Sequence, residues 1–201
     1  ITAIRRQRED WQRDATRQLA TGRTGEALSA YEQAGHVHVA DRRELASAGL
    51  IERWDRDRLQ SPDVSRIILT HTNDEVRSLN DAARERLRSA GELGADIRTQ
   101  TERGARMFAT GDRVMFLKNE RGLGVKNGMR GEIEQVSPTQ MTVRLDAGRP
   151  DAGRSVAFDL KDYAQIDHGY AATIHKSQGV TVDRTHVLAT PGMDRHGAYV
   201  A

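Results

Sequence analysis

A run of large apolar residues that leads straight into a helix start is the feature that most constrains this fold. Residues 67–69 read Ile-Ile-Leu, which is typical of a strand buried on both faces. Thr72 and Glu75 then have the spacing of a capping box, and apolar residues recur at helical spacing as far as Leu87. A buried strand followed by a helix of this length predicts a βα unit and a parallel sheet.

The segment 1–62 has a helical pattern. Apolar residues recur at near-helical spacing from Ile4 to Leu19, a second short helix is expected over residues 26–33, and residues 36–40 alternate like a brief strand. Asp41 and Glu44 have capping-box spacing and are expected to open a third helix. The apolar side chains expected in helical cores are Trp11, Leu45, Ile51 and Trp54.

From about Thr99 the hydrophobic period changes to two. Short strands separated by Gly, Asn and Pro are predicted at residues 113–117, 131–136, 141–145 and 155–159. Strands this closely spaced indicate a small barrel, and we expect Phe116 and Phe158 to fill it. A strand at residues 185–189 then resumes the α/β pattern, so we interpret the barrel as an insertion in an α/β domain.

Composition limits the classes of function. The chain of 201 residues can bury a real core, and it has no cysteine for disulfides or thiolate chemistry. No apolar run is long enough to cross a bilayer, and the arginines at residues 5 and 6 lead into a polar stretch that does not resemble a secretion signal. We therefore expect a cytoplasmic protein with no membrane partner.

The most informative stretch is residues 170–179, which read YAATIHKSQG. Five polar side chains fall within six residues: Thr173, His175, Lys176, Ser177 and Gln178. Hydroxyl, imidazole and ammonium groups so concentrated can hold phosphate oxygens through charge-assisted hydrogen bonds. A polar surface turn is the alternative interpretation, and composition alone favours it.

The heptapeptide TIHKSQG at residues 173–179 resembles a motif in the second motor domain of superfamily-one DNA helicases of the RecD-like and Pif-like type. In those helicases the motif touches the backbone of single-stranded DNA and couples that contact to the nucleotide site. The resemblance implies that Thr173 and His175 contact DNA phosphates. It also implies that Lys176 and Ser177 shape the same DNA-binding surface.

The same resemblance assigns four residues to the nucleotide side. Gln178 and Gly179 end the heptapeptide, and residues 4–7 (IRRQ) are similar to a segment in which these helicases hold an arginine against the γ-phosphate. Arg6 is therefore the candidate catalytic arginine finger, with Gln7 beside it. Taken on its own, Arg6 would be interpreted as a solvated helix residue.

Two further stretches follow in the expected order. Residues 68–80 resemble the strand and helix that open the second motor domain, which implies that Thr70 and Asn73 lie near DNA. Helix capping is the simpler role for Thr72 or Asn73. Residues 111–115 and 124–128 are similar to the start of the SH3-like domain that grips the DNA strand in these helicases.

Cationic side chains on the early loops of this SH3-like segment are candidates for DNA binding. Lys126 is the candidate assigned to the DNA-binding set, and three more are Lys118, Arg121 and Arg130. The Asn-Gly pair at residues 127–128 is also the usual sequence of a tight hairpin turn. That turn is the better interpretation of the pair.

The resemblance implies an α/β fold in which a RecA-like second motor domain, a parallel sheet with helices, carries an inserted small SH3-like β-barrel. An N-terminal helical segment from the end of the first motor domain precedes it. The expected division is 1–62 for that helical segment, 63–118 for the first part of the second motor domain, 119–162 for the barrel and 163–201 for the truncated second part. The first sixty residues and the helicase-like stretches most resemble TraA-type conjugative relaxase-helicases.

ATP hydrolysis needs groups that this sequence does not contain. No G-x-x-x-x-G-K-[ST] phosphate loop is present, and no acidic pair follows a buried strand. ATP and Mg²⁺ are therefore expected in the intact protein, and no cofactor is expected in this fragment, which we predict to be inactive alone. Thr181 stands where related helicases often have a glutamate for the nucleotide sugar, and the seven scattered histidines predict no metal site.

These observations predict a fragment of an ATP-dependent DNA helicase that acts in conjugative plasmid DNA transfer. Its expected partners are single-stranded DNA and the first motor domain and relaxase domain of the same longer chain. One alternative is a non-catalytic protein- or nucleic-acid-binding module built on the SH3-like barrel. The other is a structural accessory domain with a decayed motor.

Overall fold

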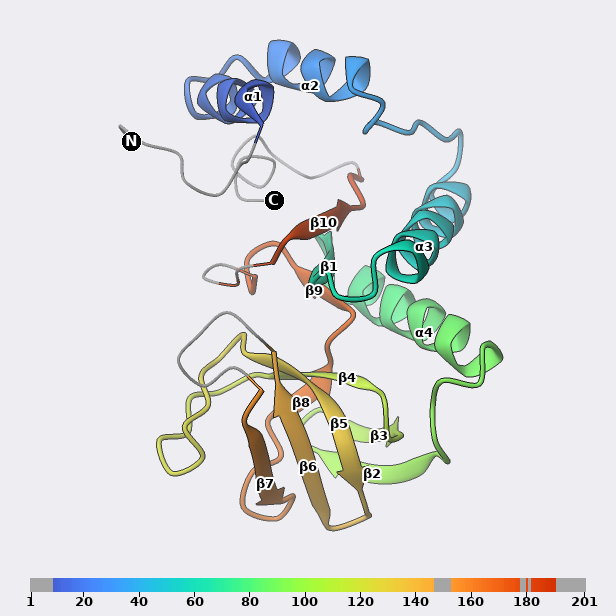
Figure 1. The fold of residues 1–201 in the computed structure, drawn as a ribbon, viewed down its shortest axis with the longest axis vertical. Helices are drawn as coiled ribbons and strands as arrows, with labels where there is room; N and C mark the ends of the chain where they lie inside the picture. Colours follow the sequence, from blue (N-terminus) through green and yellow to red (C-terminus); the bar gives the residue numbers. More distant parts are fainter. Residues whose placement is uncertain (1–8, 147–152, 178–179, 181, 191–201) are drawn as a thin grey trace.

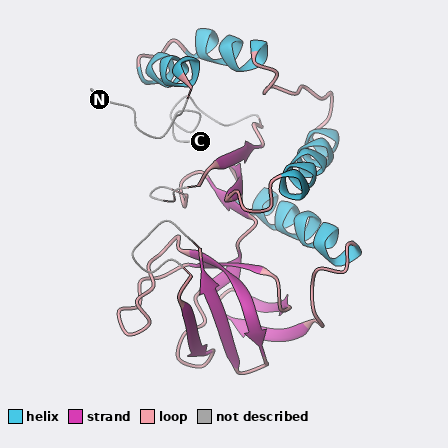
Figure 2. Cartoon of the chain, in the orientation of Figure 1, coloured by secondary structure: helices cyan, strands magenta, loops and turns pink. Residues whose placement is uncertain are grey.

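The computed structural model describes residues 9–146, 153–177, 180 and 182–190. Two helices lie at one end of the molecule, an antiparallel sheet lies at the other, and a small parallel sheet with two more helices lies between them (Figure 1). Figure 2 shows the same division by colour, because the helices and the larger sheet occupy different halves. The helices are α1 (Asp10–Ala20), α2 (Thr24–Gln33), α3 (Arg43–Gln60) and α4 (Asn73–Ser89).

The predicted parallel sheet is confirmed. Strands β1 (Arg66–Thr70), β9 (Ala171–Thr173) and β10 (Arg184–Val187) pair in the order β10-β1-β9, and both ladders are parallel. The central strand is buried on both faces, since Ile68 packs with α3 and α4 residues such as Leu79 while Leu69 packs with Met115. The apolar run therefore forms the strand that its composition predicted.

Helix α4 starts as the sequence predicted. Its N-cap Thr72 accepts a hydrogen bond from the backbone N–H of Glu75, and the Glu75 side chain accepts one from the backbone N–H of Thr72. This capping box satisfies two backbone donors that a helix start leaves free. It also fixes the N-terminus of α4 beside the carboxyl end of β1.

The second sheet is antiparallel and has the order β7-β6-β5-β4-β8. Its strands are β4 (Arg113–Phe116), β5 (Arg130–Val136), β6 (Gln140–Leu145), β7 (Ser155–Asp159) and β8 (Ile166–His168). The four strands predicted from the alternating pattern are all present. Phe116 and Phe158 are buried in its core, as expected, with their ring centroids 5.9 Å apart.

The predicted closed barrel differs from the observed sheet. Among the described residues no sheet is closed, and β7 and β8 form the two edges of the antiparallel sheet. Alternation of apolar and polar residues is the same in an open and in a closed sheet, so the pattern predicted the strands and not the pairing of the edges. Strands β4 and β8 also pair in this sheet although they lie outside the range 119–162 expected for the insertion.

A separate hairpin of β2 (Ile97–Thr101) and β3 (Gly104–Phe108) precedes the antiparallel sheet. Its turn is closed by Thr101, whose hydroxyl donates to the carbonyl oxygen of Gly104 at 2.8 Å. Gly104 has a φ of +98°, a conformation that only glycine adopts without strain. The change of period near Thr99 marked this region, but the hairpin was not predicted as a separate unit.

Three predictions for the N-terminal segment are wrong. Residues 36–40 form no strand, and α3 begins at Arg43 with Arg42 as an N-cap that has no side-chain cap, so the capping box of Asp41 and Glu44 is absent. Leu45 is 58% exposed, whereas Trp54 is 3% exposed. Nine residues turn a helix through about 900°, so Leu45 lies on the face opposite Trp54.

The other expected core residues of this segment differ in how far they are buried. Ile51 and Trp54 are buried against β1 and α4, as predicted. Trp11 is only half-buried, and it packs with Tyr31 at 5.1 Å and His36 at 5.7 Å between ring centroids. Helices α1 and α2 therefore form a small pair of their own.

The two sheets are joined by a very short link. Only Gly169 and Tyr170 separate β8 from β9. The N–H of Gly169 donates to the carbonyl oxygen of Arg113 at 2.9 Å, and a Cβ on Gly169 would lie 2.7 Å from the carbonyl carbon of Val114. The absence of a side chain at Gly169 thus lets the link between the two sheets run directly against β4.

Candidate nucleic-acid interface

Residues 173–177, hereafter the motif turn, begin at the last residue of β9. The N–H of Ser177 donates to the carbonyl oxygen of Thr173 at 3.0 Å, and the Ser177 hydroxyl donates to that of Ile174 at 2.8 Å. Thr173 is buried, His175 is exposed and Lys176 is half-buried. Local hydrogen bonds therefore fold the segment into a turn that leaves the imidazole and the ammonium group at its surface.

The motif turn lies beside the N-terminus of α4. The Lys176 ammonium donates to the side-chain oxygen of Asn73 at 3.0 Å, and Thr173 is in register with Thr70 of the neighbouring strand. Four of the predicted DNA-binding residues thus lie close together at one edge of the parallel sheet. Carboxyl ends of parallel strands are a common location for ligand sites.

Thr70 is the most deeply buried member of this group. It is fully buried, and its hydroxyl donates to the Glu75 carboxylate at 2.5 Å. Glu75 is itself 7% exposed and makes an ion pair with Arg43 of α3 at 3.0 Å. Burial raises the pKa of Glu75, but the hydrogen bonds from Thr70 and Thr72 outweigh it and hold the pKa below its ordinary value. Sequence reasoning found Glu75 only as part of the capping box.

Asn80 of α4 holds the start of strand β9 in place through hydrogen bonds to its backbone. The Asn80 side-chain oxygen accepts from the N–H groups of Tyr170 at 3.0 Å and Ala171 at 2.8 Å, and its amide donates to the carbonyl oxygen of Ala171 at 3.2 Å. Among the described strands β9 is an edge of its sheet, so Asn80 supplies hydrogen bonds that another strand would supply. Nothing in the sequence pattern distinguished Asn80 from a solvated helix residue.

A second buried group fixes the start of the polar segment. The Tyr170 hydroxyl donates to Asp112 at 2.8 Å, and Asp112 also accepts from the Arg84 guanidinium at 2.9 Å and from the N–H of Ala109 at 2.7 Å. Burial and the neighbouring Asp112 charge raise the pKa of Tyr170, which keeps its hydroxyl protonated as a donor. Two segments singled out in the sequence, residues 111–115 and 170–179, are therefore in direct contact.

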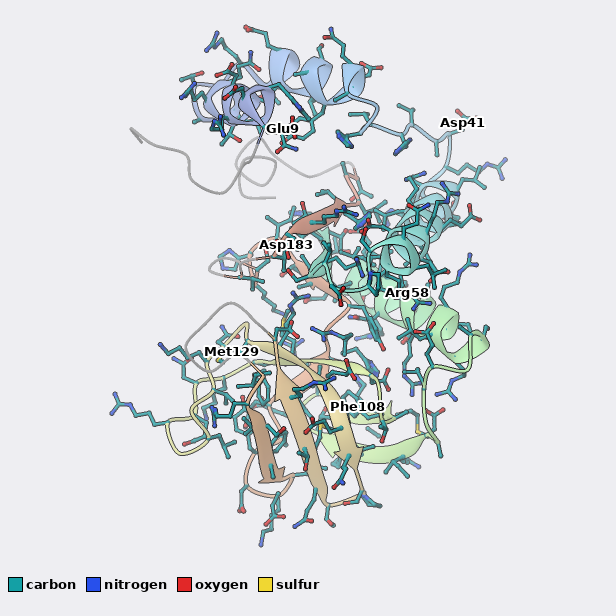
Figure 3. All side chains as sticks on the ribbon, viewed as in Figure 1. Glu9, Asp41, Arg58, Phe108, Met129 and Asp183 are labelled. Atoms are coloured by element: carbon teal, nitrogen blue, oxygen red, sulfur yellow. The ribbon has the colours of Figure 1, made fainter. Side chains whose placement is uncertain are left out.

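A tight turn of the antiparallel sheet lies against the motif turn. The N–H of Met129 donates to the carbonyl oxygen of Lys126, and Gly128 has a φ of +83°, so the predicted turn at residues 127–128 is confirmed. A Cβ on Gly128 would lie 3.4 Å from Val180 and 3.7 Å from the carbonyl oxygen of Lys176. Met129 lies on the side of the antiparallel sheet that faces the parallel sheet (Figure 3). The exposed Lys126 thus belongs to a turn that touches the motif turn.

Of the other cations on these loops, two are exposed and one is not. Lys118 and Arg121 are exposed. Arg130 is 6% exposed, and its guanidinium donates to the carbonyl oxygen of Arg66 at 2.7 Å and lies 3.6 Å from Asp146. Burial, followed by the nearby Arg113 charge, lowers the pKa of Arg130 to about 10. The expectation that Arg130 is a surface cation is therefore wrong, because it connects the two sheets instead.

The nucleotide-side candidates lie outside the described residues: Arg6, Gln7, Gln178, Gly179 and also Thr181. Among the residues that the structure describes, no group of three or more acidic or histidine side chains is arranged to hold a metal ion. Within the same ranges, no helix combines the length and the apolar character that crossing a bilayer requires.

Sequence comparison identifies several similar proteins. A family model described as an AAA domain matches residues 1–42. The whole chain is 43% identical to the probable conjugal transfer protein TraA of Sinorhizobium fredii and 42% identical to conjugal transfer protein TraA of Agrobacterium fabrum. The chain spans 18% of the length of each of these relatives. A shorter match, 39% identical over 83 residues, covers 36% of this chain and 19% of the ATP-dependent DNA helicase Pif1 of Bdellovibrio bacteriovorus.

Structural comparison identifies helicases with the same arrangement of elements. The structure of Bacteroides Pif1 helicase in complex with ADP-AlF3 and single-stranded DNA matches with a TM-score of 0.62 at 19% identity, over 99% of this chain and 47% of that one. Pif1 helicase from Candida albicans matches with a TM-score of 0.59 at 17% identity, over 99% of this chain and 52% of that one. At these identities the likeness is one of fold.

Proposed function

We propose that this chain, which is homologous over its whole length to the TraA conjugal transfer proteins and has the RecA-like fold of a superfamily-one helicase motor, binds single-stranded DNA. In this proposal it is part of an ATP-dependent DNA helicase that acts in conjugative DNA transfer. A TraA relative is more than five times as long, because the chain spans 18% of it. The rest of the longer protein would supply the first motor domain and the relaxase domain.

The observation that carries the proposal is the meeting of three polar segments at one edge of the parallel sheet. The motif turn contributes His175 and Lys176, the N-terminus of α4 contributes Asn73, and the touching turn of the antiparallel sheet contributes Lys126. Cations and polar groups placed side by side on a fixed backbone suit a chain of phosphates. Since the 126–129 turn lies against the motif turn, the antiparallel sheet would grip the strand in the manner of an SH3-like domain.

The nucleotide part of the proposal rests on groups beyond the described residues. The described part of the chain offers no phosphate loop and no acidic metal site, so it does not by itself fit ATP with Mg²⁺. In the longer protein we expect the first motor domain to hold both, with Arg6, Gln7, Gln178 and Gly179 facing the nucleotide from this side. The expected division into 1–62, 63–118, 119–162 and 163–201, the RecD-like assignment and a cytoplasmic location belong to the same proposal.

The alternative of a peptide-binding module has little support in the antiparallel sheet. Its aromatic side chains Phe116, Phe158 and Tyr163 are all buried in one core. Peptide-binding barrels present aromatic side chains in an exposed groove, and the described residues of this sheet offer none. A purely structural role would leave the polar side chains His175 and Lys176 at the surface of the motif turn without a purpose.

The test is fluorescence anisotropy of a labelled single-stranded oligonucleotide, titrated with this chain over a series of salt concentrations. We expect binding that weakens as salt rises, because phosphate contacts release counterions. Lys176→Ala should weaken binding about tenfold, in line with the loss of one charge-assisted contact. The matched control is Lys161→Ala, an exposed lysine next to the β5–β6 turn, at the end of β5 opposite to the 126–129 turn, which should leave the affinity nearly unchanged.

Two outcomes would contradict the proposal. If the chain binds no oligonucleotide even at low salt, it does not bind DNA on its own surface as proposed. If the two lysine variants weaken binding equally, general charge and not the motif turn attracts the DNA.

A further inference from the structure

The tip of the β2–β3 hairpin lies over a small cleft that it shares with the motif turn. The cleft is lined by Arg103 of the hairpin, Asp167 of β8, and Thr173 and Lys176 of the motif turn, with Met115 among its apolar residues. Its volume is about 20 Å³, room for about one water molecule. A group larger than water would therefore have to bind at the mouth of the cleft, where the charged side chains are.

Positive charge exceeds negative charge around this mouth. Asp167 is shared by two guanidinium groups, at 3.6 Å from Arg103 and 3.3 Å from Arg106. Lys176 faces the same cleft, and burial followed by the nearby Arg103 charge lowers the pKa of its ammonium group, while Asp167 opposes this. Like charges held near one another are unfavourable unless an anion lies between them. The arrangement thus favours a bound anion.

The hairpin tip is fixed in position although the Arg103 side chain remains 41% exposed. The N–H of Arg103 donates to the Thr101 hydroxyl at 3.2 Å, and the N–H of Glu102 donates to the carbonyl oxygen of Ala164 at 3.0 Å. Because the backbone at the tip is already fixed, only the Arg103 side chain has to be ordered when its guanidinium binds a ligand. Its planar donors suit two oxygens of one phosphate group.

We propose that Arg103 and Lys176 together bind one phosphate group of single-stranded DNA, and that this phosphate takes the place of Asp167 as the partner of Arg103. The inference rests on the proposed function and adds a contact from the β2–β3 hairpin, a segment that no sequence motif marked. It extends the DNA path from the motif turn across the mouth of the cleft to the hairpin tip.

The first test compares two arginines of the same hairpin in the oligonucleotide titration. Arg103→Ala should weaken binding about tenfold and should reduce the slope of log affinity against log salt by about 0.7, the value for one phosphate contact on a single strand. Arg98→Ala removes an exposed arginine of β2 away from the tip and should change neither quantity. Equal effects of the two variants would overturn the proposal.

A second variant separates phosphate binding from damage to the fold. Asp167→Asn removes the competing carboxylate but keeps a side-chain oxygen. In the unaltered chain the Asp167 oxygen accepts a hydrogen bond from the N–H of His168 at 3.0 Å, and the asparagine oxygen can accept the same bond. We expect binding about threefold tighter, since a like charge near the phosphate is removed. Weaker binding by this variant would overturn the proposal, because structural damage and not competition would then explain it.

A double variant tests whether the two cations hold the same phosphate. Arg103→Ala should cost less affinity in a Lys176→Ala background than in the unaltered chain, because the shared contact is already lost. Fully additive effects would show that the two side chains bind different groups, against the proposal.

Inorganic phosphate distinguishes failure of this inference from failure of the proposed function. In NMR spectra of the arginine side-chain N–H groups, the Nε signal of Arg103 should shift on titration with phosphate, and that of Arg98 should not. Oligonucleotide binding that is indifferent to Arg103→Ala would overturn this inference and leave the proposed function standing. A phosphate-induced shift without oligonucleotide binding would overturn the assignment to DNA and keep an anion site.

Discussion

The two sheets of this molecule are stabilised in different ways. The antiparallel sheet buries a continuous apolar core that includes Phe116, Ile133 and Val143. Among the described residues the parallel sheet has three strands, with apolar clusters on both faces. Buried polar groups complete it, above all Asn80 and Asp112.

This difference corresponds to two roles: the antiparallel sheet supports, and the parallel sheet positions the proposed DNA-binding residues. Apolar packing is not directional, so it stabilises a sheet without specifying where one short strand ends. Hydrogen bonds are directional, and those of Asn80 and Asp112 fix the start of β9 at Tyr170 and Ala171, two residues before the motif turn begins at Thr173. The polar interior of the parallel sheet thus positions the proposed DNA-binding surface, and the apolar interior of the other sheet supports the turn that touches it.

The largest effect is expected from breaking the apolar core. Phe116→Ala should lower the free energy of unfolding by about 4 kcal/mol, because a fully buried aromatic side chain is removed and a cavity remains. Urea unfolding measures this, and Leu59→Ala, at a side chain that is 62% exposed, is the control with a change below about 0.5 kcal/mol. A loss below about 1 kcal/mol for Phe116→Ala would mean that this core does not stabilise the sheet as described.

Next in size is the buried ion pair that lies between the two sheets. Asp112→Ala should cost about 3 kcal/mol, since it leaves the Arg84 guanidinium with less compensation and the Tyr170 hydroxyl without its acceptor. Asp96→Ala removes the other, partly exposed partner of the same arginine and should cost less than about 1 kcal/mol. Similar losses of stability for the two variants would mean that the buried Arg84–Asp112 ion pair contributes no more than the partly exposed Arg84–Asp96 pair.

A smaller effect is expected at the clamp on β9. Asn80→Ala should cost about 2 kcal/mol, because two backbone N–H groups and one carbonyl lose their partner in a buried place. Hydrogen exchange of the Tyr170 and Ala171 amides should accelerate more than that of the β6 amides, which speed up only by the global loss of stability. Ser78→Ala, at an exposed position of the same helix, should change neither. Unaltered exchange at Tyr170 and Ala171 in the Asn80 variant would show that the side chain does not hold the strand.

The smallest effect expected is on the pH dependence of stability, and it arises from Glu75 beside the parallel sheet. The pKa of Glu75 in the folded chain lies below its ordinary value of 4.5, so its charged form stabilises the fold above that pH. This contribution is lost as pH falls from about 4.5 through the lower pKa of the folded state. Glu75→Gln should therefore show a weaker decline of stability over that acid range, measured by urea unfolding at several pH values. An identical decline in both proteins would contradict the role of Glu75.

Features encoded by neighbouring residues were predictable from the sequence. The strand at residues 67–69, the capping box of Thr72 and Glu75, and the turn at residues 127–128 each depend on contacts within a few residues. The alternating pattern also predicted the strands around Phe116 and Phe158. Local spacing carries this information because backbone conformation and side-chain direction are set locally.

Features that depend on distant contacts were not predictable. Asn80 bonds to Tyr170, 90 residues away in the chain, and Arg130 bonds to Arg66, 64 residues away, so neither pattern nor spacing revealed them. The failed capping box at Asp41 shows the converse, since a correct local pattern formed no cap. Around the motif turn, the sequence singled out polar residues that lie close together in the structure, but it did not show that Thr70 of β1 faces Glu75 while Lys176 faces Asn73.

The pairing of β4 with β8 has a consequence for the evolution and engineering of this chain. Val114 near the start of the antiparallel sheet lies opposite His168 near its end, so the chain leaves that sheet beside the point at which it arrived. The two ends of the segment between Val114 and His168 are therefore held together. The entropy cost of closing a loop rises only slowly with its length. Residues could thus be added or removed at the far side of the sheet, or the sheet exchanged for another module, without changing the spacing of β1 and β9.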